Sequence, residues 1–183
     1  TWNVENGSTS KLSHYRLRDN YSRFYLKYIL PNRLKIESRD MSKTSLTRLL
    51  GWNSIMGLQV ENLVLSNRHL IKQALKIDPT EVVCDNPFFQ RKNAKRSGCQ
   101  IDYMIQTEHN TLYLCEIRYS KNEIGTQIIA EMKQKIKKLN LPKRFSYRTV
   151  LIHVNGISES LEDNQFFTHT IALGDFLKPI SER

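Results

Sequence analysis

The sequence is poor in the patterns that identify disulfide-rich, membrane-spanning or P-loop proteins. Its three cysteines, Cys84, Cys99 and Cys115, have no CxxC spacing and are odd in number, which argues against a zinc knuckle and a disulfide scaffold. No apolar run approaches the roughly 20 residues that cross a bilayer. The phosphate-binding patterns GxxxxGKS and GxxxxGKT are also absent. We therefore expect a cytoplasmic protein with reduced cysteines, no membrane partner and no nucleotide site in this stretch of chain.

The chain also has no signal-peptide pattern and begins at Thr1 rather than at methionine. We expect it to be part of a longer polypeptide. Its composition is that of a globular protein, because 39% of its residues are hydrophobic and 25% are charged. A length of 183 residues suits one ordinary domain with a small helical piece attached.

Acidic residues are too few to balance the basic ones. The chain has 28 Lys and Arg against 18 Asp and Glu, a net charge of +10, and a pI near 9.6. Such a charge favours a polyanionic partner, and DNA is the leading candidate. A merely solvated basic surface is the alternative. An anionic membrane is disfavoured, because no basic helix carries a strong apolar face rich in Trp or Phe.

Residues 1–54 are predicted to form an N-terminal leader and helical linker segment. The polar, turn-rich start of the chain indicates a disordered or extended leader. Residues 15–30 then carry apolar and aromatic side chains at helical spacing, with Asp19 or Asn20 as the N-cap and Pro31 as the stop.

Residues 55–183 are predicted to form the main domain, an α/β fold with a mixed β-sheet flanked by helices. One long helix is expected over residues 54–75, before Asp78-Pro79. The turn Glu108-His109-Asn110 suits a hairpin between two of the strands that follow. The expected strands are 82–84, 87–91, 100–107, 111–119, 147–154 and 169–173, with a helix at 122–139. This order of strands and helices is typical of a mixed sheet.

Three acidic residues interrupt apolar segments of the predicted core. Glu61 lies in the helix that should pack on the sheet, and Asp102 lies within a strand. Glu116 and Arg118 are two residues apart on the next strand, so alternation places both on one face. Buried unpaired carboxylates are unfavourable, and a structure that keeps three together usually supplies metal ions or cations.

Glu61, Asp102 and Glu116 are therefore predicted to be metal ligands and catalytic residues. Their oxygen donors suit Mg²⁺ or Mn²⁺, which can polarise a phosphodiester and activate a water. Glu61 is either a third ligand or the carboxylate that positions the water, and Arg118 would clamp the phosphate. The alternative is that each acid pairs with a nearby Lys or Arg at a sheet end.

These residues carry a resemblance to a known family. Glu61 on a helix, Asp102 on a strand and then Glu116-Ile117-Arg118 resemble the PD-(D/E)XK nuclease signature, which implies a restriction-endonuclease-like fold. A longer resemblance, to the C-terminal part of bacterial and archaeal AAA-type ATPases of the DUF234 group, covers most of the chain. It is carried by the segments YRLRDNYSRF (15–24), GLQVENLVL (57–65) and GCQID (98–102). It implies that N-terminal ATPase and winged-helix modules of the same polypeptide are partners, and that the protein acts on or near DNA.

The third motif departs from the family pattern, because Arg118 stands in place of the usual lysine. Arginine stays protonated and cannot act as a base. Lys121 and Lys92 are alternative cations. Three functions therefore stay open: a Mg²⁺-dependent DNA phosphodiesterase, a degenerate nuclease fold that binds DNA or regulates the ATPase, and a protein-interaction appendage.

Basic residues near the predicted site and on the helix at 122–139 are expected to contact the DNA backbone. A solvated helix face is the alternative for the helical lysines. The predicted nucleic-acid-binding residues are Gln90, Arg91, Lys92, Lys95, Arg96, Lys121, Lys133 and Lys137.

Overall fold

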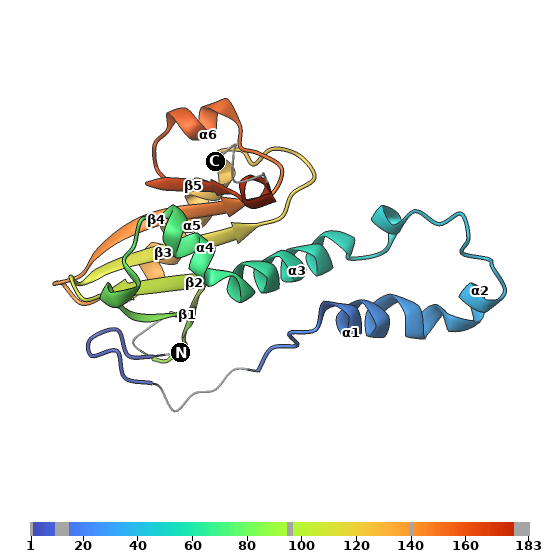
Figure 1. Cartoon of the computed structure of the whole chain (residues 1–183), viewed down its shortest axis with the longest axis horizontal. Coiled ribbons are helices and arrows are strands. Elements are labelled where there is room, and N and C mark those ends of the chain that lie inside the picture. Colours follow the sequence, from blue (N-terminus) through green and yellow to red (C-terminus); the bar gives the residue numbers. More distant parts are fainter. Residues whose placement is uncertain (1, 10–14, 95–96, 140, 178–183) are drawn as a thin grey trace.

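The computed structural model describes residues 2–9, 15–94, 97–139 and 141–177. Its centre is a five-stranded mixed sheet of order β1-β2-β3-β4-β5 (Figure 1). The first three strands run antiparallel to one another, and β3, β4 and β5 run parallel. The strands are β1 (Val82–Gln90), β2 (Cys99–Thr107), β3 (Thr111–Arg118), β4 (Ser146–His153) and β5 (His169–Ala172).

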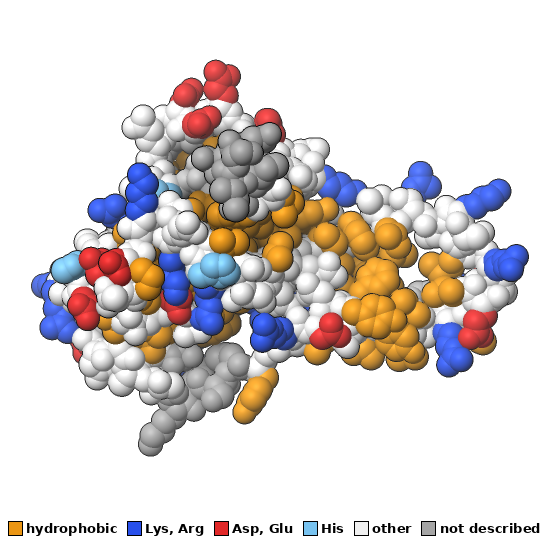
Figure 2. Space-filling view, viewed as in Figure 1, with side chains coloured by type: hydrophobic (Ala, Val, Ile, Leu, Met, Phe, Trp, Pro, Cys, Tyr) orange, Lys and Arg blue, Asp and Glu red, His pale blue; other side chains and the backbone are white. Residues whose placement is uncertain are grey.

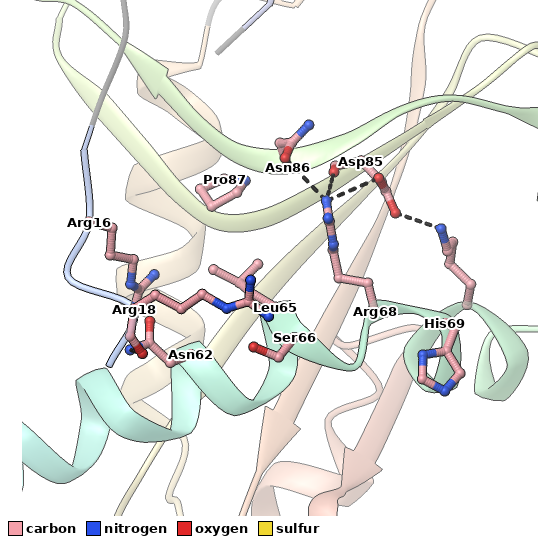
Figure 3. A pocket seen from close by; sticks show the side chains of 11 residues that line it. Arg16, Arg18, Asn62, Leu65, Ser66, Arg68, His69, Asp85, Asn86 and Pro87 are labelled. Atoms are coloured by element: carbon pink, nitrogen blue, oxygen red, sulfur yellow. Dashed lines mark hydrogen bonds and ion pairs between the residues drawn. The ribbon is translucent and has the colours of Figure 1, made fainter. Parts of the chain in front are cut away.

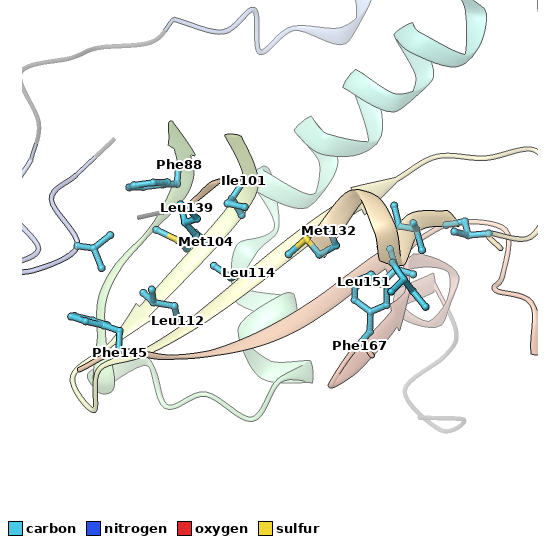
Figure 4. Close-up of a cluster of buried hydrophobic side chains, with 14 of the residues drawn as sticks. Phe88, Ile101, Met104, Leu112, Leu114, Met132, Leu139, Phe145, Leu151 and Phe167 are labelled. Carbon is cyan, nitrogen blue, oxygen red and sulfur yellow. The ribbon is translucent and has the colours of Figure 1, made fainter. Parts of the chain in front are cut away.

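Helices cover both faces of this sheet. On one face, α5 (Gln127–Lys138) buries Ile128, Ile129 and Met132 in a core that includes Leu114 (Figure 4). On the other face, α3 (Trp52–Ser66) and α4 (Arg68–Ala74) contribute to a second core. A short α6 (Glu159–Asp163) precedes β5. The predicted fold class is confirmed as an α/β fold, in which a mixed sheet is flanked by helices and a small helical segment precedes it.

Strand β3 explains why the sequence forms two cores. Leu112 and Leu114 belong to the core under α5, while Cys115 and Ile117 belong to the core under α3 and α4. Successive strand side chains point to opposite faces, so a central strand needs apolar residues at every position. Glu116 is therefore an exception in an apolar strand, on the same face as Leu114.

The predicted hairpin between β2 and β3 is confirmed. Its turn places Asn110 at a φ of 53°, a left-handed conformation that asparagine tolerates. From β3 the chain crosses through α5 to the parallel strand β4, as a parallel pair requires.

The N-terminal helical segment runs beside α3 as an arm that projects from the sheet (Figure 1). Asp19 caps it by accepting hydrogen bonds from the backbone N–H groups of Tyr21 and Ser22. Its parts are α1 (Asn20–Phe24), a π-helical turn (Tyr25–Ile29), a 3₁₀ turn (Leu30–Asn32) and α2 (Arg33–Glu37).

Aromatic side chains hold the arm against the start of α3. The ring of Trp52 lies 6.4 Å from that of Phe24 and 6.3 Å from that of Tyr28, between centroids. The hydroxyl of Tyr28 donates to the carbonyl of Leu50 at 3.0 Å. Figure 2 shows hydrophobic side chains gathered over this arm.

Two expected helices differ from the structure. The single helix over residues 54–75 is broken at Asn67 into α3 and α4, because the Asn67 side chain donates to the carbonyl of Leu63 and competes with the helical backbone. The predicted N-cap Asp19 is confirmed, since the N-terminal helix begins at Asn20, but Pro31 does not stop it. Proline sits in the first turn of a 3₁₀ segment, where no N–H is needed.

One pair of expected strands also differs. Residues 82–84 and 87–90 belong to the single strand β1, which ends at Gln90 and whose register with β2 shifts at two places. Among the described residues, no helix combines the length and the apolar character that crossing a membrane would require.

The start of the chain belongs to the sheet core, contrary to the expected disordered or extended leader. Trp2 and Val4 are buried in the core under α5. The indole of Trp2 donates to the side-chain oxygen of Gln106 at 2.8 Å and meets the ring of Phe88 edge-on at 5.3 Å. The boundary predicted after residue 54 falls inside α3, which begins at Trp52. The division into two domains stays a prediction.

Replacement of Trp2 by alanine is expected to lower the free energy of unfolding by about 3 kcal/mol, since it opens a cavity and removes a buried hydrogen bond. Urea unfolding measures this change. Leu50→Ala is the control, because Leu50 is 92% exposed, and it should change stability by less than about 0.5 kcal/mol. A Trp2 variant as stable as this control would show that the leader does not contribute to the core.

Candidate functional site

An irregularity in β2 positions Asp102. Between the pairs Phe88↔Ile101 and Asn86↔Met104, β2 contains one more residue than β1. This is the pattern of a β-bulge, which re-aims a side chain out of the regular alternation. Asp102 lies in the bulge.

Asp102 also changes the hydrogen bonding between β2 and the neighbouring strand β3. The register of β2 with β3 runs from Gln106↔Leu112 to Tyr103↔Cys115. Beyond it, the backbone N–H of Ile117 donates to Oδ2 of Asp102 at 3.1 Å instead of to a carbonyl of β2. The carboxylate thus enters the sheet where β2 and β3 part, directly beside Glu116.

Glu116 lies on the face of β3 that α5 covers. Its side chain is only 2% exposed, and both of its oxygens accept from cations. Oε1 is 2.8 Å from a guanidinium nitrogen of Arg118, and Oε2 is 2.5 Å from Nζ of Lys135. Arg118 also pairs with Glu131 of α5. The four residues form a chain of alternating charge between the strand and the helix, in the order Lys135, Glu116, Arg118 and Glu131.

Glu61 approaches from the opposite layer, on α3. Its Oε2 is 2.6 Å from a guanidinium nitrogen of Arg16, and its side chain is 19% exposed. The same Arg16 nitrogen donates to the carbonyl of Leu58 at 3.3 Å. Glu61 is therefore fixed by a residue of the segment that precedes α1.

Electrostatics link the three acids through Asp102. Burial raises the pKa of Glu116, and the nearby charge of Asp102 raises it further, while Lys135 and Arg118 act against the rise. Burial likewise raises the pKa of Glu61, with Asp102 again adding to it and Arg16 opposing it. Asp102 is thus the common neighbour of both glutamates. Perturbed carboxyl groups of this kind cluster at functional sites, although ion-pair networks produce them too.

The structure brings Asp102 close to each glutamate, but the three acids do not form one cluster. Within the described ranges, no group of three or more His, Cys, Asp or Glu side chains is arranged to hold a metal ion. Their donor chemistry still suits Mg²⁺, which needs only one or two carboxylates when waters and substrate phosphates complete its shell. The three-ligand metal site stays a prediction.

Arg118 occupies the predicted position on the same face of β3 as Glu116, and two glutamates hold it there. Its Nε is buried and has no hydrogen-bond partner in the described part of the chain. The alternative cations Lys121 and Lys92 are exposed, and the described contacts of Glu116 involve neither.

Sequence reasoning missed Lys135 and Glu131 as members of this site. Helical periodicity contained a signal for both, because Ile128 and Met132 are buried against the sheet and residues three or four apart share a helix face. Glu131 follows Ile128 by three positions, and Lys135 follows Met132 by three. The sequence did not indicate which residues of β3 Glu131 and Lys135 would contact, because these contacts depend on how α5 packs on the sheet.

The predicted nucleic-acid-binding residues are mostly exposed. Arg91, Lys92, Lys121, Lys133 and Lys137 are at the surface, and Lys133 lies over the ring of Phe166 at 5.5 Å. Gln90 instead has a structural contact, since its amide donates to the carbonyls of Ser97 and Lys138, both at 2.7 Å. Lys95 and Arg96 lie outside the described residues. The nucleic-acid role of this set stays a prediction.

The fold of this chain has a likeness among solved structures. No family model matches this chain, and no curated protein matches it. The chain is similar to the crystal structure of a repair endonuclease from Pyrococcus abyssi, with a TM-score of 0.40 and 15% sequence identity. The similarity covers 61% of this chain and 43% of that one, so the chain spans less than half of the endonuclease.

The pH dependence of stability tests the environment of Glu116. Because its pKa is raised in the folded protein, protonation favours folding, and this contribution is lost as the pH rises above the ordinary glutamate value of about 4.3. Glu116→Gln removes the titration. The stability of the wild type relative to this variant should therefore fall as the pH rises above about 4.3, as measured by urea unfolding.

Glu37→Gln, on the exposed surface of α2, controls for the loss of one negative charge. A wild type that gains stability relative to Glu116→Gln as the pH rises would mean that Lys135 and Arg118 outweigh the effect of burial.

Proposed function

We propose that this domain is a nuclease-like module that binds DNA and hydrolyses phosphodiesters with Mg²⁺ or Mn²⁺. The observation that carries the proposal is the position of Asp102, which lies in a bulge between Glu61 and Glu116 and affects both carboxyl groups. The order of these acids along the chain is that of the PD-(D/E)XK signature.

Asp102 and Glu116 would hold the ion. One oxygen of Asp102 accepts from Ile117, and the other has no partner among the described residues. The bound ion would supply a polarised phosphate and a more acidic water. Glu61 also has one oxygen without a described partner, so it can accept a proton or orient the attacking water at the edge of the site.

Lys135 is the cation that best replaces the lysine of the family pattern. It reaches Glu116 from α5, whereas Arg118 follows Glu116 along β3. A lysine amine is a point charge that can release its proton, which a guanidinium cannot do. In this arrangement Lys135 offsets charge on the phosphate, and Arg118 holds Glu131 and Glu116 in place.

A second candidate is a nuclease fold that binds DNA or regulates its partner modules without cutting. The ion pairs of Glu116 favour it, because Arg118 and Lys135 occupy both oxygens that a metal ion would need. Metal binding must then displace at least one of these cations. The two candidates therefore differ in a measurable property, the affinity of the carboxylates for a divalent ion.

The ATPase connection belongs to the same proposal. The segments that resemble the DUF234 group include residues 15–24, which contribute Arg16 to Glu61 and the start of the helical arm. The arm places exposed hydrophobic side chains away from the sheet, among them Leu26, Leu30 and Leu34. Such a surface suits contact with the ATPase and winged-helix modules that the resemblance implies.

Metal binding and cleavage should depend on the same two carboxylates. Calorimetric titration of Mg²⁺ and Mn²⁺ into the wild type is expected to show binding that an Asp102→Asn/Glu116→Gln double variant loses. Incubation of both proteins with plasmid and branched DNA should give cleavage by the wild type alone. Binding of DNA without metal binding or cleavage would favour the second candidate. Cleavage that survives in the double variant would place the active site elsewhere.

Lys135→Gln is expected to slow cleavage by about 100-fold, as loss of a charge-stabilising group at a reacting phosphate does. The affinity for Mg²⁺ should change less, because Lys135 is not a ligand. Lys35→Gln on exposed α2 is the matched control and should keep full activity. If Lys135→Gln cleaves as fast as Lys35→Gln, the lysine only neutralises Glu116. Thermal unfolding of each variant verifies that it is folded in the assay.

A further inference from the structure

A basic cavity lies beside the candidate site, on the side of α3. It has a volume of about 560 Å³ and lies between the segment before α1, the junction of α3 with α4, and the middle of β1 (Figure 3). Of the residues predicted to bind nucleic acid, none of those that the structure describes lines it. Its volume falls within the range of about 300 to 1,000 Å³ that is common for ligand sites.

Positive charge dominates the lining of this cavity. Arg16, Arg18, Arg68 and Lys72 line it, against Asp85 as the one carboxylate in the lining. Asp85 is already neutralised, since its oxygens lie 3.3 Å from a guanidinium nitrogen of Arg68 and 2.6 Å from Nζ of Lys72. The remaining positive charge is available to an anion.

Three of the four cations, Arg16, Arg68 and Lys72, are held in place by ion pairs before any ligand binds. Arg68 donates to the backbone carbonyl of Asp85 at 2.6 Å and to the side-chain oxygen of Asn86 at 3.1 Å. The buried amide of Asn62 donates to the carbonyl of Arg18 at 3.1 Å and so fixes that part of the backbone. Figure 3 shows the two sides of the cavity, with Arg18 on one and Arg68 on the other. Fixed cations bind an anion with less loss of conformational entropy.

Arg18 is the cation with most freedom to meet a ligand. It is exposed, and within the described residues its side chain makes no hydrogen bond or ion pair. Arg16, by contrast, both lines the cavity and pairs with Glu61 at 2.6 Å. The cavity therefore adjoins the carboxylate site through a shared arginine.

The helix α3 sets the spacing between the carboxylate site and the basic cavity. Glu61 faces Arg16, and Leu65 and Ser66 line the cavity one turn later. One helical turn advances about 5.4 Å, so an extended strand that passes the carboxylates needs little more than one nucleotide to reach the cavity. The volume accommodates a nucleotide unit rather than a lone phosphate ion.

We propose that this cavity binds a backbone phosphate of a nucleic-acid strand, next to the phosphate at the carboxylate site. The inference rests on the proposed function for the identity of the strand. It does not depend on cleavage, because Arg16, Arg18 and Arg68 contact phosphate whether or not a divalent ion is present. Phosphate contacts of this type position a strand without reading its bases.

The test is the binding of a fluorescein-labelled single-stranded oligonucleotide in EDTA, followed by anisotropy over a series of salt concentrations. Arg18→Gln should weaken binding about fivefold and lower the slope of log K against log salt by about 0.7, the loss of one single-strand phosphate contact. Arg18→Lys should restore most of the affinity, since lysine remains a phosphate-binding charge. Lys43→Gln, an exposed change in the turn that follows α2, is the charge-matched control.

Equal affinity and equal salt slope for Arg18→Gln and Lys43→Gln would overturn the proposal. So would tight binding of inorganic phosphate to the wild type that leaves the oligonucleotide unaffected, because the cavity would then serve a free anion. A different result would contradict the proposed function, namely wild-type protein that neither binds Mg²⁺ nor cleaves DNA. Because binding is measured in EDTA, that failure does not alter the result for Arg18.

Discussion

Glu116 is almost fully buried between β3 and α5, and an ionised carboxylate persists there only when cations satisfy its oxygens. Lys135 and Arg118 meet this need from the helix and from the strand itself, and Glu131 balances the second charge of the pair. The network therefore fixes how α5 lies on the sheet. Under the proposed function, a metal ion that bound Glu116 would have to displace at least one of these cations.

Asp102 extends this constraint to the other face of the sheet. The bulge in β2 places its carboxylate where β2 and β3 part, and there it accepts a hydrogen bond that a regular ladder would give to a carbonyl. From that position its charge acts on Glu116 in one layer and on Glu61 in the other. A single irregular residue thus connects two acids that the sheet would otherwise separate.

Arginines surround these acids on the α3 side. Arg16 neutralises Glu61 and lines the basic cavity, so a chain segment that lies before the helical arm joins both places. Under the proposed function, the cavity would hold an anionic strand beside acids whose present cations a metal ion would replace.

Local patterns in the sequence determined the β2–β3 hairpin, the alternation of β3 and the placement of Asp102 and Glu116 on adjacent strands, because these depend on residues only a few positions apart. Tertiary structure alone decided that Lys135 meets Glu116 and that Arg16 meets Glu61. Each of these contacts joins segments far apart in the chain. Trp2 entered the core for the same reason, since its partner Gln106 lies 104 residues away. Sequence periodicity specifies which face of an element is apolar, but only packing specifies what that face touches.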